Sequence, residues 1–293
     1  MLHVKNLTRR FGTNTAVNNV SFVVPAGHMT GFVGANGAGK TTTMRMIMGV
    51  LAAHGGEVLL DGEPLTAQLR AGFGYMPEER GLYPKQPIID QLVYLGQLHR
   101  MSARGARAGA LELLERFGLA DRSKDKLEAL SLGNQQRVQI AASLLHRPTV
   151  LILDEPFSGL DPLAVDAMVE LLRERTAEGV PVLFSSHQLD LVDRLCDSLV
   201  VLQKGEVVAA GSGTELRAGA VQQHRLSAPP DAGWIREEAG VTVIDVEGSN
   251  AVLEIKDAAT AQRLLAKAMA RGTVEEFAPI RRSLSELYRE VVK

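Results

Sequence analysis

The chain has 293 residues, of which 45% are hydrophobic and 23% charged, and its formal net charge at pH 7 is −2. This composition is typical of a globular protein, and the length suits two domains. The balance of 32 basic against 34 acidic residues argues against a nucleic-acid-binding protein by bulk charge. The single cysteine, Cys196, excludes an internal disulfide. We expect neither a membrane span nor a signal peptide, because no apolar run reaches about 18 residues and the first residues lack an apolar core.

The first part of the chain alternates predicted short strands with one glycine-rich loop. Loosely alternating apolar residues predict a strand over 17–24, which a Pro-Ala-Gly turn ends, and another strand over 29–33. The loop of residues 34–42, GANGAGKTT, follows, and a helix is predicted over 42–48. Residues 57–63 then indicate a strand that enters a tight Asp-Gly turn.

The glycine-rich loop fits the phosphate-binding pattern G-x-x-x-x-G-K-[ST], in the strand–loop–helix context that this pattern requires. Glycines let consecutive backbone N–H groups point at phosphate oxygens, and the helix N-terminus adds the positive end of its dipole. We expect Lys40 to reach the β- and γ-phosphates, Thr41 to bind Mg²⁺, and Thr42 to face the α-phosphate. The nucleotide-binding residues predicted from this loop are Gly34, Asn36, Gly37, Ala38, Gly39, Lys40, Thr41 and Thr42.

The middle of the chain is predicted to be helical and to lead into an α/β region. Apolar residues recur at helical spacing over 88–118, with a break near Gly105, and another helix is predicted over 134–146. Strands and helices then alternate, with strands over 150–153 and 182–184, helices over 163–176 and 188–195, and a hairpin over 198–210. Continuous apolar strands between helices indicate a parallel sheet covered on both faces.

Two carboxylates follow the predicted strand at residue 150. The segment 151–157 reads LILDEPF, which places Asp154 and Glu155 at the C-terminal end of a buried strand, where open α/β sheets carry their active sites. We expect Asp154 to hold Mg²⁺ through water, and Glu155 to accept a proton from an attacking water. A strand that simply ends in a polar loop is the alternative, but the phosphate loop upstream favours function. The sequence thus predicts a protein that binds a nucleoside triphosphate with Mg²⁺ and hydrolyses it.

A change of composition near residue 220, with several glycines and the pair Pro229-Pro230, predicts a domain boundary. Beyond it we predict strand, helix, strand, strand, helix, strand and a final helix, over 222–227, 231–238, 241–246, 251–255, 258–271, 273–277 and 284–292. The first six elements follow the split β-α-β order of ferredoxin-like domains.

Residues 130–138 read LSLGNQQRV, and here the chain resembles the ATP-binding-cassette family, whose signature is LSGGQ followed by a polar-basic helix. The resemblance covers about residues 1–218. It implies that Ser131 and Gly133 approach the γ-phosphate of ATP bound to a partner cassette. Three other segments match in the family's order. The segment Ser158-Gly159-Leu160-Asp161 resembles its dimer-contact loop, in which Ser158, Gly159 and Asp161 are implied to make the contact. The segment Ser185-Ser186-His187 resembles the one that carries its switch histidine, and Phe11 stands at the position of its adenine-stacking aromatic. His187 is implied to contact the γ-phosphate and to orient the attacking water.

The chain departs from the family pattern in two places. In the signature, Leu132 replaces a glycine and Asn134 replaces a glutamine, but Ser131 and Gly133 remain, so we expect the signature to function. In the segment 73–84, FGYMPEERGLYP, Glu78 stands where the family usually has a glutamine that contacts Mg²⁺. A carboxylate is a capable Mg²⁺ ligand, although it adds negative charge beside Glu155. Whether Glu78 or Glu79 faces the site stays open at this point.

The resemblance implies a phosphate-loop cassette over residues 1–219, and the predicted element order beyond it indicates a small ferredoxin-like α+β accessory domain over 220–293. The cassette is expected to have a mostly parallel sheet core, an antiparallel β subdomain and a helical subdomain at about 86–146. We expect an ATP-hydrolysing transporter subunit that works peripherally, at the cytoplasmic side of the cell membrane. It would form a head-to-tail dimer with a second copy or a paralogous cassette, and drive a separate integral membrane permease through the region 75–83.

Export is favoured over import by the PEERGLYP segment, the LSLGN signature and the small C-terminal domain; no cargo is indicated and no nucleic-acid partner is expected. One alternative is a nucleotide switch not coupled to transport, such as a ribosome-associated cassette, but those usually carry two cassettes in one chain. A DNA-repair cassette is disfavoured because residues 43–129 contain no sustained heptads. Another alternative is a regulatory module whose C-terminal domain senses a ligand.

Overall fold

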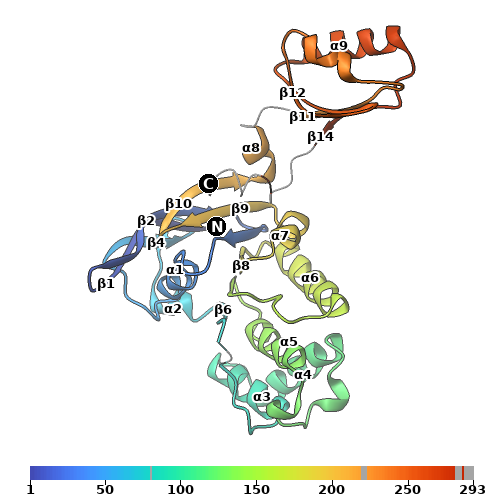
Figure 1. The fold of residues 1–293 in the computed structure, drawn as a ribbon. Helices are drawn as coiled ribbons and strands as arrows, with labels where there is room; N and C mark the ends of the chain where they lie inside the picture. The colour runs from blue at the N-terminus through green and yellow to red at the C-terminus, as the bar shows by residue number, and fades with distance from the viewer. Residues whose placement is uncertain (80, 219–222, 281–285, 287–293) are drawn as a thin grey trace. The chain divides into compact units, whose positions relative to one another are not determined.

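The structure is a computed structural model that describes residues 1–79, 81–218, 223–280 and 286. The contacts divide it into two compact units between Gly213 and Thr214, which are described separately below (Figure 1). Within the described residues, no helix is both long enough and apolar enough to cross a membrane.

The first unit is built on a six-stranded sheet in the order β10-β9-β3-β8-β7-β6. Five strands run parallel, as the apolar runs predict, and the sixth forms a hairpin with its neighbour. The strands are β3 (Met29–Val33), β6 (Phe73–Met76), β7 (Val150–Leu153), β8 (Val182–Ser186), β9 (Ser198–Gln203) and β10 (Glu206–Ser212). Strands β3, β7 and β8 are completely buried, which confirms a sheet covered on both faces.

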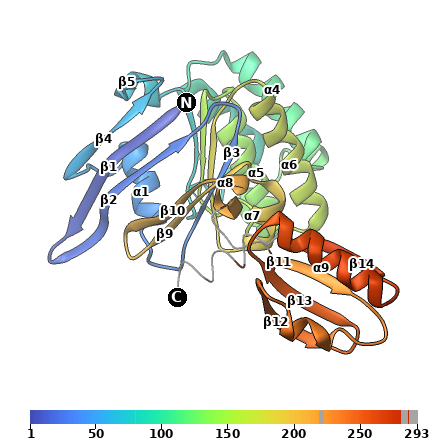
Figure 2. The same cartoon turned by 90° about the horizontal axis from the view of Figure 1, so that it is seen from above.

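A second, antiparallel sheet has the order β2-β1-β4-β5. Its strands are β1 (Leu2–Phe11), β2 (Asn14–Val24), β4 (Gly55–Leu60) and β5 (Glu63–Pro64). Helix α1 (Lys40–Ile47) lies between the two sheets (Figure 2), and Met44 and Ile47 on this helix are fully buried. The rings of Phe22 and Phe32, one from each sheet, lie 5.2 Å apart between centroids. This apolar layer holds the start of α1 at the edge of the parallel sheet.

Helices α3, α4 and α5 form a separate group beyond β6, at the bottom of Figure 1. The remaining elements of this unit are α2 (Ala67–Arg70), α3 (Ile88–Leu98), α4 (Ala103–Arg116), η1 (Ala120–Arg122), η2 (Leu127–Ala129), α5 (Leu132–Leu144), α6 (Pro162–Ala177) and α7 (Leu189–Leu195). Helix α8 (Gly213–Ala218) starts at the last residue of this unit and continues into the second. The break predicted near Gly105 falls earlier, between α3 and α4, because the Ser102 side chain accepts a hydrogen bond from the Gly105 N–H and caps α4 there. Helix α5 likewise begins two residues before its predicted start, because Ser131 caps it.

The second unit is a four-stranded antiparallel sheet in the order β12-β13-β11-β14, which is the ferredoxin-like order. Its elements are β11 (Gln223–Ser227), η3 (Gly233–Glu237), β12 (Val241–Glu247), β13 (Asn250–Ile255), α9 (Ala258–Arg271) and β14 (Glu276–Ile280). A core that includes Leu226, Leu253 and Leu264 joins the sheet to α9.

Two predictions in this unit need correction. The predicted helix over 231–238 is a short 3₁₀ turn, in which the Asp231 carboxylate accepts the Gly233 N–H and so competes with helix formation. The strand predicted at 273–277 begins instead at Glu276, because pairing with β11 sets Phe277 opposite the buried Leu226. The predicted final helix at 284–292 lies outside the described residues apart from Glu286.

Candidate nucleotide-binding site

Parallel strands bring the predicted site residues to one edge of the main sheet. Val33 at the end of β3 is paired with Ser186 of β8, and Leu153 of β7 is paired with Phe184. The loops that follow these three strands therefore leave the sheet side by side. They carry the glycine-rich loop, the Asp154-Glu155 pair and His187.

The glycine-rich loop takes its shape from two glycines that have no room for a side chain. A Cβ at Gly34 would lie 2.4 Å from the backbone oxygen of Leu202, and one at Gly39 would lie 2.6 Å from that of Ala16. Gly39 also has φ 104° and forms the cap that precedes α1, a conformation that glycine adopts without steric strain. The loop is thus wedged against the backbone of its neighbours, and within it the Ala38 N–H donates to the Ala35 carbonyl at 3.0 Å.

A cavity of about 250 Å³ lies over this loop. Its lining residues are Ala16, Asn36, Gly37, Ala38, Gly39, Lys40, Thr41, Thr42, Glu78, Asp154 and Glu155. The Lys40 side chain is buried within the loop, where its Nζ donates to the Gly34 carbonyl at 2.7 Å and to the Ala35 carbonyl at 3.3 Å. A cation held among carbonyls at the start of a helix attracts phosphate oxygens.

Asp154 offers an unshared carboxylate oxygen at the same cavity. Only 1% of the residue is exposed, and its Oδ1 accepts a hydrogen bond of 2.6 Å from the Ser185 hydroxyl. The other oxygen, Oδ2, is buried and has no hydrogen-bond partner among the described residues. Because a buried, unpaired carboxylate oxygen is costly, this atom suits a hard cation or one of its water ligands. Thr41 and Glu78, which line the same cavity, add the other oxygens expected for Mg²⁺.

Glu155 lies between the phosphate loop and His187. Its side chain is 14% exposed, and its Oε2 lies 3.0 Å from Nδ1 of the more exposed His187. The residue has φ 50°, a left-handed conformation that is uncommon for a residue other than glycine. Its backbone N–H donates to the Ser185 hydroxyl at 2.8 Å, so Ser185 links the two carboxylate residues.

A second cavity of about 410 Å³ adjoins the first and shares three of its lining residues. Asn36, Glu78, Leu132, Gln136, Glu155, Ser158, Gly159 and His187 line it. Glu78 borders both cavities, whereas Glu79 lines neither. The geometry therefore favours Glu78 as the residue that faces the site.

The signature segment lies beside this second cavity, at the start of α5. Ser131 is exposed and its hydroxyl accepts the Asn134 N–H at 3.4 Å. A Cβ at Gly133 would lie 2.9 Å from the carbonyl oxygen of Gly159, so the signature packs against the loop that begins at Ser158.

Asp161, in the predicted dimer-contact loop, has clear roles within its own chain. It accepts the Ala164 N–H at 2.9 Å as the cap of α6, and it forms an ion pair of 2.5 Å with Arg137. The backbone hydrogen bond and the nearby guanidinium lower the pKa of this carboxyl.

Phe11 lies apart from the lining of either cavity. It is 47% exposed at the end of β1, and the Arg9 guanidinium stands 4.8 Å from its ring centroid. Sequence reasoning gave no role to Ala16, Ser185 or Gln136, all of which contact or line the site. Ser185 had a sequence signal, since it begins the Ser-Ser-His segment, and Gln136 lies within the signature segment 130–138.

The parallel sheet, the glycine-rich loop before α1 and the paired carboxylates define a phosphate-loop nucleoside-triphosphate-binding protein. Comparison with known proteins narrows this class. The ABC transporter family matches residues 17–158, and the C-terminal domain family of DrrA1-3-like ATP-binding proteins matches residues 211–292. The chain belongs to the ATP-binding subunits of ABC transporters, a family of ATPases.

Three similar proteins illustrate the match. YhaQ of Bacillus subtilis, an uncharacterized ABC transporter ATP-binding protein, is 38% identical over 100% of this chain and 98% of its own length. The Nod factor export ATP-binding protein I of Burkholderia lata is 38% identical over 71% of this chain and 69% of its own length. A dimeric structure of a bacterial ABC transporter cassette matches with a TM-score of 0.66 and 25% identity, covering 72% of this chain and 98% of the other.

Proposed function

We propose that this chain is the ATP-hydrolysing subunit of an exporter and that it works as a head-to-tail dimer on a separate permease. The observation that carries the proposal is the single cavity bordered by the phosphate loop, by Lys40 and by the paired residues Asp154 and Glu155. Lys40 and the loop N–H groups bind the phosphates and offset their charge. Thr41, Asp154 and Glu78 hold Mg²⁺, which supplies further charge stabilisation when it is bound.

Glu155 is proposed as the general base. Its Oε2 takes a proton from a water aligned with the γ-phosphate, and the ring of His187, 3.0 Å away, fixes the orientation of that carboxylate. Glu155 has a left-handed backbone and lines the same cavity as Glu78 and His187. The exposed ring of Phe11 is proposed to stack on the adenine, on the family resemblance alone.

The dimer is proposed from the surface around the signature. Ser131 is exposed, and Leu132 and Leu163 are 62% and 82% exposed, although large apolar side chains are usually covered. A second cassette would cover this surface and bring its own ATP to Ser131 and Gly133. Ser158, Gly159 and Asp161 would lie at the same interface. The similar dimeric cassette supports this arrangement.

The permease contact is proposed at the helical subdomain. Tyr75 of the predicted contact region is partly buried against the cassette core, so the accessible part of this region lies nearer Tyr83, which is 56% exposed. On α3, Tyr94 and Leu98 are 50% and 62% exposed. An apolar patch on a helix suits a short segment of a membrane protein.

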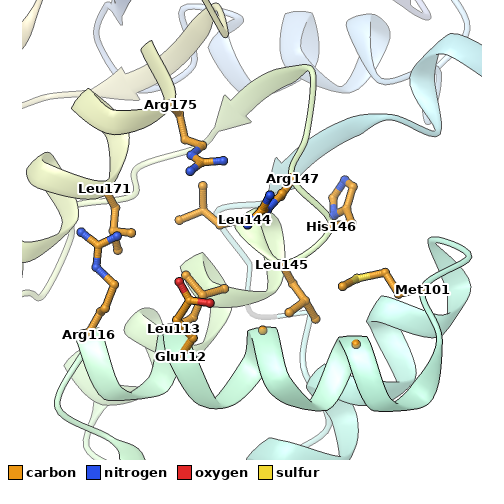
Figure 3. Close-up of a pocket in the computed structure, with 12 residues that line it drawn as sticks. Met101, Glu112, Leu113, Arg116, Leu144, Leu145, His146, Arg147, Leu171 and Arg175 are labelled. Atoms are coloured by element: carbon orange, nitrogen blue, oxygen red, sulfur yellow. The ribbon is translucent and has the colours of Figure 1, made fainter. Parts of the chain in front are cut away.

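A cleft of about 350 Å³ between this subdomain and α6 is proposed as a second point of contact (Figure 3). Leu145 and Met101 line it, with Arg116 on α4 and Arg175 on α6 on its opposite sides. Both arginines already form ion pairs, with Glu174 and Glu178 respectively. The cleft therefore offers both apolar and charged side chains, which suits an amphipathic helical loop of the permease.

Export, rather than import, is proposed from the PEERGLYP segment, the LSLGN signature and the ferredoxin-like unit, and the Nod factor export relative supports it. We propose residues 1–219 as the cassette and 220–293 as an accessory domain. We propose that the protein works peripherally, at the cytoplasmic side of the membrane. The alternatives are a nucleotide switch not coupled to transport and a ligand-sensing regulatory module.

Purification from native membranes tests the proposal. A tagged chain should recover an integral membrane protein in stoichiometric amount, and an untagged control strain should not. Recovery of ribosomes or DNA in place of a membrane protein would contradict transport coupling.

Removal of residues 220–293 then separates two roles of the accessory domain: loss of a sensor alters regulation of the ATPase, whereas loss of a structural cap mainly lowers stability or dimer formation.

A further inference from the structure

Helix α5 holds two separate loops of the site through two buried glutamines. Gln136 and Gln139 are 7% and 4% exposed and lie three residues apart, so their side chains leave the same face of the helix. Nε2 of Gln136 donates to the carbonyl oxygens of Glu155 at 3.2 Å and Pro156 at 3.1 Å. Nε2 of Gln139 donates to the carbonyl oxygen of Pro77 at 2.7 Å.

These hydrogen bonds act on the peptide groups next to two acidic side chains of the site. Glu155 has its N–H held by Ser185 at 2.8 Å and its carbonyl held by Gln136, so both sides of its left-handed backbone are fixed. The Pro77 carbonyl belongs to the peptide bond that leads into Glu78, so Gln139 fixes the start of that residue. One helix face thereby sets the direction of both carboxylates that line the second cavity.

The amide of Gln139 is poorly suited to a purely structural role. Its Oε1 is buried and has no hydrogen-bond partner in the described part of the chain. A buried acceptor without a donor is energetically costly, and a leucine or methionine at this position would avoid that cost. The donor bond to Pro77 is what the glutamine adds over an apolar residue.

The same helix begins at the signature. Ser131 caps α5, and Gly133 lies in its first turn, packed under the Gly159 carbonyl. A helix moves as a rigid rod, because its backbone hydrogen bonds fix each residue to the next turn. A displacement of Gly133 therefore reaches Gln136 and Gln139 without an intervening loop.

We propose that Gln136 and Gln139 are positioning residues that transmit the placement of the signature helix to Glu155 and Glu78 of the same chain. When a partner's nucleotide seats the N-terminus of α5, the two amides bring both carboxylates into line at the chain's own phosphate loop. The inference rests on the proposed roles of Glu155 and Glu78, and on dimer formation through the signature.

Replacing each glutamine with methionine tests this inference, because methionine keeps the length of the side chain and removes the donor. In the full chain, Gln136→Met should lower kcat for ATP hydrolysis at least tenfold, while KM for ATP and the affinity for ADP change less than twofold. Gln139→Met should behave in the same way. Ser143→Ala is the matched control, since it removes a buried α5 hydroxyl bonded to Ile140 and leaves the site loops untouched. It should keep the parent kcat.

Double variants separate positioning from loss of structure. Combined with Glu155→Gln, Gln136→Met should reduce kcat less than twofold further, because the residue that it positions is already disabled. The inference is overturned if both methionine variants keep the parent kcat. It is also overturned if Gln136→Met lowers kcat by the same factor in the parent and in the Glu155→Gln variant. If Glu155 is not the general base, a different result is expected: the Glu155→Gln variant by itself would hydrolyse ATP at the parent rate. If one methionine variant does not fold, the other provides the same test, with Glu78→Gln as the background for Gln139→Met.

Discussion

The Nδ1 atom of His187 lies 3.0 Å from Oε2 of Glu155, although 32 positions separate the two residues in the chain. Strands β7 and β8 are neighbours in the parallel sheet, and both residues follow the ends of these strands. The contact gives the carboxylate a fixed direction above the phosphate loop. Glu155 is therefore the first residue whose substitution we propose to test.

Glu155→Gln should lower kcat by about 10²–10⁴-fold, the range that a positioned general base contributes. The amide has the shape of the carboxylate but cannot accept the proton from water. ATP affinity should stay close to that of the parent, and the variant should form a dimer that persists in the presence of ATP. Steady-state hydrolysis and size-exclusion chromatography with ATP measure these effects. A parent-like rate would remove Glu155 from the mechanism.

Ser185→Ala should destabilise the protein by about 1–3 kcal/mol, because the buried Asp154 carboxylate loses a hydrogen-bond donor. It should also lower kcat, since the same hydroxyl accepts the N–H of Glu155. Urea unfolding and steady-state hydrolysis check the two effects. Ser186→Ala is the control: its hydroxyl accepts the Gln188 N–H and contacts neither carboxylate. Equal losses in the two variants would contradict a specific role for Ser185.

Alanine at each glycine of the phosphate loop should have unequal effects. Gly34→Ala and Gly39→Ala place a Cβ within 2.6 Å or less of a backbone oxygen, whereas nothing lies within 4 Å of a Cβ at Gly37. Gly37→Ala should therefore cost only the strain of its positive φ, about 1–2 kcal/mol. The Gly34→Ala and Gly39→Ala variants should unfold at a clearly lower temperature than the Gly37→Ala variant. Thermal unfolding without nucleotide compares them, and equal melting temperatures would argue against the close backbone packing.

Stability should fall as pH is lowered through the range in which His146 titrates. Burial, with a smaller effect from the stacked His99, lowers the pKa of His146 from 6.5 to about 4. The unfolded chain then binds the proton more tightly than the folded one, so stability is lost between about pH 6.5 and pH 4. His146→Gln should flatten this part of the melting-temperature profile. An unaltered profile in the His146→Gln variant would contradict this role of His146.

Local patterns in the sequence were sufficient for the main elements of the site. The loop GANGAGKTT predicts a phosphate site because backbone sterics leave few other uses for glycines beside Lys40 and Thr41. The strand LILDEPF likewise places Asp154 and Glu155 at a sheet edge. Boundaries were less predictable where side-chain caps set them, as Ser102 and Ser131 do.

In the accessory unit, too, the order of the elements was predictable but one of their boundaries was not. Its ferredoxin-like element order was readable from the alternation of strands and helices, and the sheet order agrees with it. The start of β14 was not readable, because pairing with β11 decides it and that partner lies about fifty residues earlier in the chain.

The sequence by itself determined that this protein is an ATP-binding cassette, because the phosphate loop, the carboxylate strand and the signature are each short segments whose chemistry is local. Only the tertiary structure decided how these segments are connected. Ser185 joins Asp154 to Glu155, and the amides of Gln136 and Gln139 hold the loops that carry Glu155 and Glu78. Such contacts depend on which strands and helices pack together, and hydrogen bonds between residues far apart in the chain leave no local pattern to read.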